Sequence, residues 1–354
     1  MSTFVITGGH HNSALVVAKE LKSRGHKVVW IGHRYSSRGD TVDSAEYIEV
    51  TSAKIPFHDL TAGKLVLSLN EFIRFPLGLA KSFELLKAIA PRAIISFGGY
   101  LGGTVALSAK VLDIPIYLHE QTVTAGRANK LIGKLSKKIY LTWAESAKFF
   151  DKKKIEVVGL PLRDNILSGT AKQLFTRRKP SLLVMGGKQG AHALNHFVFT
   201  HLSELLKDFN IIHQTGTSSL TGDYEKSIGY KDELGSLTDS YLPLGYIGEN
   251  EIGHYLYSAD IYLGRSGAHI CYELGVTAIP SILVPLMSTH DHEQHKNALI
   301  LEKSGIGVIL PQSELTFPHF VDKIKELKKL SGRPMQLPKD ASKEMVDSIL
   351  KTLK

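Results

Sequence analysis

The sequence predicts an α/β protein built from two doubly wound domains, and two observations support this prediction. Apolar runs of four to six residues alternate with segments of helical length, a pattern typical of buried parallel strands joined by crossover helices. The alternation pauses at Gly159-Leu160-Pro161-Leu162-Arg163 and then restarts. A chain of 354 residues is long enough for two cores. We therefore expect domains at residues 1–162 and 163–354, with the last helix free to pack on the first domain.

The apolar runs give the expected order of the elements in each domain. In the first domain we expect strands at residues 3–6, 28–31, 93–97, 116–119 and 139–142, with helices at 13–24, 101–112 and 126–135. In the second we expect strands at 181–185, 210–213, 242–246, 260–263, 281–284 and 307–310, with helices near 190–206, 249–257, 268–274, 293–303 and 313–330. Ligands of such sheets bind beyond the carboxyl ends of the strands. We therefore expect the ligand in a cleft that the two domains face across.

Composition limits the class of protein. The chain is 43% hydrophobic and 22% charged, as in ordinary globular proteins. The single cysteine, Cys271, excludes an internal disulfide and indicates a reducing compartment, with packing in a helix as its expected role. Residues 4–6 run straight into glycines, unlike a secretory leader, and no apolar run approaches the length of a membrane span. We therefore expect a cytoplasmic protein.

Positive charge is concentrated in the first half of the chain. Residues 1–163 hold 23 Lys/Arg and 13 Asp/Glu, a net charge of +10, whereas the remainder holds 20 and 21, a net charge of −1. A basic surface could bind nucleic acid, an anionic membrane or a phosphorylated substrate. No nucleic-acid motif accompanies the charge, so we favour the last two partners and expect no nucleic acid.

The most informative motif follows the apolar run that ends near residue 263. Arg265-Ser266-Gly267-Ala268 would turn this strand into a helix whose free N–H groups point at an anion. Glu273 lies on the same helix, within reach of a sugar diol, although a solvated surface charge is the alternative. Such a site suits a nucleotide diphosphate.

Further glycine loops follow other predicted strands. They are Gly8-Gly9-His10, Gly98-Gly99-Tyr100 and Gly186-Gly187-Lys188-Gln189-Gly190-Ala191. Such loops let the backbone approach a phosphate closely, although strand-to-helix turns also need glycine for geometry alone. None is G-x-G-x-x-G, so a dinucleotide cofactor is disfavoured. His292-Glu293-Gln294-His295 lacks the spacing of a zinc H-E-x-x-H motif, so we expect no zinc site of that kind, with structural zinc as the minor alternative.

These motifs together resemble the MurG family of peptidoglycan N-acetylglucosaminyltransferases. The motifs that carry the resemblance, in order, are Gly9-His10, Gly98-Gly99-Tyr100, His119-Glu120-Gln121, Asn129-Lys130, residues 159–163, residues 186–191, residues 265–268 with Glu273, and Gln294 with Asn297-Ala298. The resemblance implies the GT-B fold. It also implies inverting transfer of N-acetylglucosamine from UDP-N-acetylglucosamine to undecaprenyl-diphosphate-linked muramyl-pentapeptide, without a required cofactor or metal.

The resemblance also implies a role for each matching residue. The backbone at Ile247 would read uracil, Glu273 the ribose, Ala268 the diphosphate and Gln294 the transferred sugar. The other implied donor-binding residues are Arg163, Lys188, Gln189, Ser266, Gly267 and Asn297. The implied acceptor-binding residues are Gly8, Gly9, Gly98, Gly99, Tyr100, His119, Glu120, Gln121 and Asn129. His10 is the implied catalytic base, since a neutral imidazole can take the acceptor hydroxyl's proton.

Several structural alternatives stay open at this stage. His119 and Glu120 could support the cleft without touching a ligand, and Arg163 and Arg265 could be ion-pair partners. For His11 we favour a structural role. The functional alternatives are another GT-B enzyme, with a different lipid acceptor or a UDP-sugar 2-epimerase activity, and a non-catalytic UDP-sugar-binding protein.

Residues 65–86 are the candidate membrane-binding segment. Leucines and phenylalanines alternate there with Lys64, Arg74, Lys81 and Lys87, which would let apolar side chains enter the headgroup region while cations meet anionic lipid. A buried helix pair is the alternative. Pro76 and Gly78 interrupt the segment, so one continuous amphipathic helix is not expected. Because the implied acceptor is a lipid, we favour peripheral binding at the cytoplasmic face of the membrane.

Overall fold

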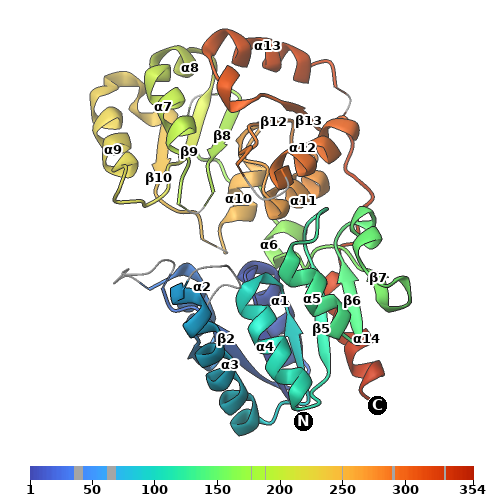
Figure 1. The fold of residues 1–354 in the computed structure, drawn as a ribbon. Coiled ribbons are helices and arrows are strands. Elements are labelled where there is room, and N and C mark those ends of the chain that lie inside the picture. Colours follow the sequence, from blue (N-terminus) through green and yellow to red (C-terminus); the bar gives the residue numbers. More distant parts are fainter. Residues whose placement is uncertain are drawn as a thin grey trace. The chain divides into compact units, whose positions relative to one another are not determined.

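The computed structural model describes residues 1–35, 43–61, 69–176, 178–187, 189–248, 250–288, 292–330 and 332–354, with side chains left out for residues 69–74. The chain forms two compact units (Figure 1). The first holds Met1–Leu162 and Pro338–Lys354, and the second holds Arg163–Leu337. The second unit thus ends at Leu337, and the last 17 residues belong to the first unit.

The first unit is a parallel sheet with the strand order β3-β2-β1-β4-β5-β6-β7. The strands are β1 (Thr3–Thr7), β2 (Lys27–Gly32), β3 (Phe57–Asp59), β4 (Ala93–Ser96), β5 (Ile116–Glu120), β6 (Lys138–Leu141) and β7 (Ile155–Val157). The helices are α1 (His11–Ser23), α2 (Ala45–Ser52), α3 (Leu69–Ile89), α4 (Gly99–Val111), α5 (Arg127–Leu135) and α14 (Ala341–Thr352), with short 3-10 turns η1 (Ala144–Phe149) and η2 (Lys152–Lys154).

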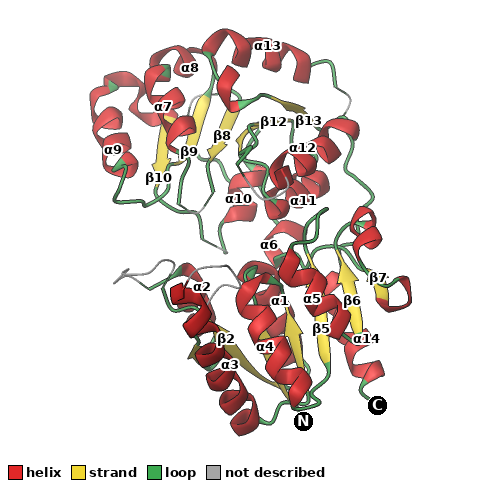
Figure 2. Cartoon of the chain, in the orientation of Figure 1, coloured by secondary structure: helices red, strands yellow, loops and turns green. Residues whose placement is uncertain are grey.

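The second unit is a parallel sheet with the strand order β10-β9-β8-β11-β12-β13. Figure 2 shows strands of this sheet among the helices of the unit. The strands are β8 (Ser181–Met185), β9 (Asn210–Gln214), β10 (Tyr241–Leu244), β11 (Ile261–Gly264), β12 (Ser281–Leu283) and β13 (Gly307–Ile309). The helices are α6 (Asp164–Leu167), α7 (His192–Thr200), α8 (Leu202–Asp208), α9 (Asp223–Glu233), α10 (Ile252–Tyr257), α11 (Ala268–Thr277), α12 (Glu293–Lys303) and α13 (Phe317–Leu327), with 3-10 turns η3 (Gly235–Ser240) and η5 (Gln312–Glu314).

Both sheets contain a switch point, where neighbouring strands send their crossovers in opposite directions. In the first sheet β1 leads away to β2 and β3, while its other neighbour, β4, leads to β5. In the second sheet β8 leads to β9, while its neighbour β11 leads to β12. Right-handed crossovers then place the two helices on opposite faces of the sheet, which leaves a crevice at the carboxyl ends of the two strands. The sequence prediction of two doubly wound domains is confirmed.

The elements that the sequence missed lie at the margins of the fold. The strands β3 and β7 form the two edges of the first sheet, have three residues each and are only partly buried. They therefore lack the continuous apolar run that marks a central parallel strand. The helices α2 and α9 were also missed, and α9 is rich in charged residues. The helix expected at residues 190–206 is divided into α7 and α8 at His201.

The expectation that Pro76 and Gly78 prevent a continuous helix is wrong. The helix α3 runs through both residues. Pro76 is exposed, whereas Gly78 is buried. The next turns pack inward: Leu86 is fully buried in the core, and the hydroxyl of Ser108 donates to the Leu79 carbonyl at 3.1 Å. From residue 75 onward the segment is therefore part core and part surface, with Leu77 65% exposed, whereas residues 65–68 and the side chains of residues 69–74 lie outside the description.

The C-terminal helix α14 completes the core of the first unit. Its Met345 and Ile349 are fully buried in one cluster with Val17 and Leu21 of α1. Arg24, at the end of α1, donates to Asp347 of α14. These contacts explain why residues 338–354 leave the second unit. No helix in the described ranges is both long and apolar enough to cross a membrane.

Candidate functional site

The predicted donor loops follow the two strands that flank the switch point of the second sheet. Gly264 of β11 pairs with Met185 of β8, and the amide of Arg265 donates to the Met185 carbonyl at 3.1 Å. The loop of residues 186–191 leads into α7, and the loop of residues 265–267 leads into α11. The first N–H groups of a helix have no partner within the helix. Two helix N-termini therefore begin at neighbouring strands, as an anion site requires.

Ser266, Gln294 and Asn297 hold the α11 loop in place. The Ser266 hydroxyl donates to the Gln294 carbonyl at 2.9 Å, and Asn297 Nδ2 donates to the Ser266 carbonyl at 3.1 Å. Gln294 Oε1 accepts from the Leu286 amide at 2.9 Å. Ser266 and Asn297 are fully buried, so they position the loop from below. At Gly267, by contrast, a side chain would meet nothing within 4 Å, and Ala268 begins the helix beside this open space.

Glu273 lies in α11 at the centre of a buried charge cluster. It is 1% exposed, and its Oε1 accepts from the guanidinium of Arg163 and lies 3.5 Å from His269 Nδ1. Burial by itself would raise the pKa of Glu273, but the Arg163 charge and the His269 contact outweigh burial and lower the pKa from 4.5 to about 2. Glu273 is therefore a carboxylate at neutral pH. Contact of Glu273 with a ribose stays a prediction.

His269 is a member of this cluster that sequence reasoning missed. It lies one helical turn before Glu273, so the i,i+4 spacing could have indicated the contact. Arg163 lies 110 residues away from Glu273 in sequence, and no spacing rule could predict that ion pair.

The loop after β8 contains the next group of predicted donor residues. Gly190 has φ +85°, and a side chain there would lie 2.0 Å from the Thr215 carbonyl oxygen, so only glycine fits. The side chain of Gln214 donates to the Gly187 carbonyl at 2.8 Å and fixes the other end of the loop. Gln189 is exposed at the loop surface, where a ligand can reach it. Lys188 lies outside the described residues.

Ile247 and Arg265 take different positions around these loops. Ile247, which follows β10, has a buried side chain, so the predicted uracil contact would come from its backbone. The Arg265 guanidinium donates to the Val284 carbonyl at 3.0 Å and to Gln312 Oε1 at 2.6 Å. Arg265 thus ties the loop to neighbouring segments through neutral oxygens. Of these two arginines, Arg163 is the one that forms an ion pair, with Glu273.

The predicted acceptor loops flank the switch point of the first sheet. Gly8 and Gly9 follow β1, Gly98 and Gly99 follow β4, and the Gly9 amide donates to the Gly98 carbonyl at 3.3 Å. With the Gly9 amide, three of the amides in these loops are bonded inside the protein. The Gly98 amide donates to Ser96 Oγ at 3.2 Å and the Gly99 amide to Asn129 Oδ1 at 3.1 Å. Tyr100, 37% exposed in the first turn of α4, presents its side chain to solvent.

Glu120 and Asn129 form a buried support beneath the Gly99 loop. Asn129 Nδ2 donates to Glu120 Oε2 at 2.7 Å, while its Oδ1 accepts from the Gly99 amide. Glu120 Oε1 accepts from the amide and hydroxyl of Thr122, each at 3.0 Å. A side chain at Gly98 would lie 2.5 Å from Asn129, which explains the glycine there. Direct contact of Glu120 or Asn129 with an acceptor stays a prediction.

His119 and Gln121 are also buried at the end of β5. His119 Nε2 donates to the Gly159 carbonyl at 3.0 Å, because a carbonyl oxygen can only accept. Gln121 Oε1 accepts from the Ser13 hydroxyl at 3.0 Å and so fixes the first turns of α1. Both side chains connect the strand end to neighbouring segments, the arrangement expected of supporting residues. Their contact with the acceptor stays a prediction.

The adjacent histidines His10 and His11 differ in their surroundings. His10 is the N-cap of α1, half-buried, and directly follows the glycines at the switch point. The Nε2 of His11 lies 3.0 Å from Glu49 of α2, with the two side chains 13% and 15% exposed. His11 therefore links α1 to α2, and His10 is the imidazole beside the acceptor loops.

Two further features of the described residues lie outside these loops. No group of His, Cys, Asp or Glu there is arranged to hold a metal ion, although His290 and Asp291 lie outside the description.

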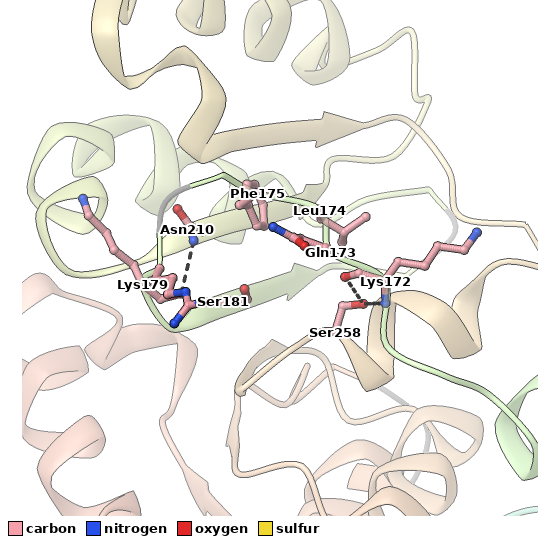
Figure 3. Close-up of a pocket in the computed structure, with 9 residues that line it drawn as sticks. Lys172, Gln173, Leu174, Phe175, Lys179, Ser181, Asn210 and Ser258 are labelled. Atoms are coloured by element: carbon pink, nitrogen blue, oxygen red, sulfur yellow. Dashed lines mark hydrogen bonds between the residues drawn. The ribbon is translucent and has the colours of Figure 1, made fainter.

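A polar hollow opens at the amino ends of β8 and β9, beside Ser181 and Asn210 (Figure 3). It is lined by Lys172, Gln173, Leu174, Phe175, Arg178, Lys179, Ser181, Asn210 and Ser258. It lies at the edge of the sheet opposite the glycine loops, so we assign no nucleotide to it.

Comparison with known families assigns both units to domains of a single family. Residues 5–141 match the glycosyltransferase family 28 N-terminal domain, and residues 181–353 match the C-terminal domain of the same family. A UDP-N-acetylglucosamine–N-acetylmuramyl-(pentapeptide) pyrophosphoryl-undecaprenol N-acetylglucosamine transferase from Clostridium tetani is 30% identical over 97% of this chain and 94% of its own length. The enzyme of the same name from Pseudomonas syringae is 29% identical over 91% of this chain and 87% of its own length.

Solved structures share the fold over the whole chain. MurG from Acinetobacter baumannii has a TM-score of 0.72 at 22% identity and covers 99% of this chain and 100% of its own. A UDP-GlcNAc 2-epimerase from Neisseria meningitidis has a TM-score of 0.65 at 14% identity, with 99% and 100% covered. The fold class predicted from the sequence, GT-B with two Rossmann-like domains, is confirmed.

Replacing Glu273 by glutamine should destabilise the second unit at neutral pH. The change leaves the buried Arg163 charge without its partner, which typically costs about 3–5 kcal/mol of the free energy of unfolding. Because the folded pKa lies below the ordinary value, the carboxylate contributes its full stability above about pH 4.5 and loses it as the pH falls toward about 2. The difference between wild type and Glu273→Gln should therefore shrink on acidification, as measured by urea unfolding at several pH values. A difference that stays constant from pH 7 to the acid limit would contradict the ion pair.

Proposed function

The chain belongs to glycosyltransferase family 28 and, within it, to the UDP-N-acetylglucosamine–N-acetylmuramyl-(pentapeptide) pyrophosphoryl-undecaprenol N-acetylglucosamine transferases, and from this premise we propose its reaction. It transfers N-acetylglucosamine from UDP-N-acetylglucosamine to the undecaprenyl-diphosphate-linked muramyl-pentapeptide, with inversion at the anomeric carbon. The observation that supports this proposal best is the placement of the predicted loops. Glycine loops flank the switch point of each sheet, one pair for each substrate diphosphate.

In the proposed donor site the nucleotide lies along the carboxyl ends of β8 and β11. The N-terminus of α11 at Gly267-Ala268 binds the diphosphate, Glu273 accepts from the ribose hydroxyls, and the backbone at Ile247 contacts uracil. Gln294 contacts the transferred sugar. Fixed N–H dipoles stabilise the charge that develops on departing UDP, so we expect no metal ion to be required. The same helix N-terminus thus binds the donor and stabilises the leaving group.

In the proposed acceptor site the lipid diphosphate lies against the loops after β1 and β4. The acceptor hydroxyl oxygen attacks the anomeric carbon, the bond from that carbon to the UDP oxygen breaks, and the hydroxyl proton passes to the imidazole of His10. Glu120 and Asn129 keep the Gly99 loop in the geometry that receives the phosphate. This role of His10 is supported by its position directly after the loop glycines, as the N-cap of α1.

The proposed reaction is tested with donor labelled in its sugar. The label is incubated with the enzyme and the undecaprenyl-diphosphate muramyl-pentapeptide, with a soluble acceptor, or with neither, with and without EDTA. The proposal expects a labelled lipid product only in the first mixture and equally with EDTA. Release of an epimer or free sugar without acceptor would favour the epimerase alternative, and binding without any product would favour a UDP-sugar-binding protein.

We also propose that the first unit binds the cytoplasmic face of the membrane peripherally, because its acceptor is a lipid. Three features of α3 support this: Leu77 is 65% exposed, Lys81 is exposed, and so is Lys87. A lysine near an anionic surface contributes about 1 kcal/mol of binding free energy, which salt screens. The helix α5 and the turn η2 add further exposed lysines to the same unit.

Replacement of His10 by alanine should reduce the rate of transfer by about 10²–10⁴-fold, the usual range for loss of a general base. UDP affinity should stay unchanged, because His10 belongs to the acceptor loops. The matched control is His11→Gln, which keeps a hydrogen-bonding side chain opposite Glu49 and should transfer at nearly the wild-type rate. Single-turnover transfer and calorimetry with UDP measure the two effects. Near-normal transfer by His10→Ala would remove His10 as the base.

Replacement of Leu77 by serine should weaken binding to phosphatidylglycerol vesicles at low salt, since it removes the exposed apolar contact without touching the core. Leu220→Ser is the matched control, because Leu220 is 96% exposed but lies in the second unit. Co-sedimentation at low and high salt, with neutral vesicles in parallel, measures the effect. If Leu77→Ser and Leu220→Ser bind equally well, α3 is not the membrane-binding segment.

A further inference from the structure

A histidine and a buried aspartate form a pair beside the proposed donor site. His192 is the first residue of α7, and Asp223 is the first residue of α9. His192 Nδ1 lies 3.1 Å from Asp223 Oδ1 and 3.0 Å from Oδ2. The carboxylate is 2% exposed, whereas the imidazole is 58% exposed. A buried anion thus holds a solvent-facing imidazole by one of its two ring nitrogens.

A buried polar network fixes the orientation of this pair. Asn195 Nδ2 donates to Asp223 Oδ2 and to the Thr215 carbonyl, both at 2.8 Å, so Asn195 Oδ1 must face His213. His213 Nε2 then donates to that oxygen at 3.0 Å, and Tyr241 donates to His213 Nδ1 at 3.0 Å. Burial lowers the pKa of His213 to about 3, so it stays neutral. The donor and the acceptor of each hydrogen bond in this network are therefore defined.

The network leaves Asp223 negatively charged. Burial opposes that charge, but hydrogen bonds from Asn195 and His192 outweigh burial and lower the pKa of the Asp223 carboxyl. A carboxylate can only accept, so Nδ1 of His192 carries a proton and donates to Asp223, and Nε2 is the ring nitrogen that the aspartate leaves available. Nε2 makes no hydrogen bond with any described residue. When Nε2 is protonated, His192 is an imidazolium with a free donor.

His192 lies next to the loop that we assign to the nucleotide. It directly follows the loop of residues 186–191, which leaves β8 at the switch point, and β11 with its diphosphate-binding loop is the adjacent strand. Adjacent strands are about 4.8 Å apart, a separation that one nucleotide diphosphate can span. The network also fixes the loop, because the Thr215 carbonyl that Asn195 binds is the atom against which Gly190 packs.

We propose that His192, protonated at Nε2 and oriented by Asp223, donates a hydrogen bond to the diphosphate of the nucleotide sugar. This inference rests on the proposed function, because it assumes that UDP binds at this switch point. The described titratable groups that face His192 are Asp223 and Lys226 from α9, which lie 3.8 Å apart, and His196 from α7, whose ring is 6.3 Å from that of His192. Binding of the nucleotide then takes up a proton, and UDP affinity falls as the pH rises.

The test is calorimetry with UDP at about pH 6 and about pH 8, because an imidazole changes its charge in this region. Wild type should bind UDP about tenfold more tightly than His192→Gln at the lower pH and about equally at the higher pH, as expected for one charge-assisted hydrogen bond. His192→Arg, a permanent cation, should keep tight binding at both pH values. His196→Gln, the matched control on the same helix, should follow wild type.

Proton uptake gives a second readout that a structural role of His192 would not change. Titrations in buffers of different ionisation enthalpy should show more proton uptake for wild type than for His192→Arg. Since both proteins bind the same UDP, titration of the nucleotide itself cancels in the comparison. Equal uptake, or equal affinity of wild type and His192→Gln at the lower pH, would overturn the inference while leaving the donor site intact. Absence of UDP binding in every protein would instead overturn the proposed function.

Discussion

The switch point of a parallel sheet is the constraint on which the rest of this structure depends. Where neighbouring strands send their crossovers to opposite faces, no helix covers the carboxyl ends of the two strands. In the first sheet this place lies between β1 and β4, and in the second between β8 and β11. The four predicted glycine loops follow those four strands. Topology therefore decides where a phosphate can approach the backbone, and glycine decides how closely.

A second constraint follows from the first, because loops at an open edge need support from below. Three of these loops are each supported by a different buried carboxylate. Glu120 supports the Gly99 loop through Asn129, Asp223 supports the loop after β8 through Asn195, and Glu273 is held beneath the α11 loop by Arg163. A buried charge is costly unless each lone pair has a partner. The partners named here lie 9, 28 and 110 residues from their carboxylates, each outside the carboxylate's own helix or strand, so the charges connect each loop to other elements of its own domain.

Sequence reasoning was reliable where one local pattern decides the structure. The central strands are largely buried apolar runs, and the loops after β1, β4 and β8 contain glycines with a positive φ that other residues tolerate poorly. It was unreliable where tertiary packing decides. The helix α3 runs through Pro76 because its later turns pack into the core, and Asp223 is buried in a segment too polar to predict a helix. The pairing of Arg163 with Glu273 has no signal in sequence spacing at all.

The same distinction separates the positions of the site from the roles of its residues. The resemblance to the family correctly located the functional loops at the carboxyl ends of the strands, since sequence motifs are inherited together with the backbone that carries them. It did not separate side chains that face a ligand from those that hold the loop. Burial makes that separation: Tyr100, Gln189 and His192 are exposed at the edge, whereas His119 and Asn297 are fully buried with hydrogen bonds to carbonyl groups. An exposed residue can exchange its partner for a ligand at little cost, but a buried one would leave a carbonyl unsatisfied. Apart from the buried carboxylate of Glu273, ligand recognition at both edges is therefore expected from exposed or half-buried side chains and from backbone amides, on loops that the buried residues keep rigid.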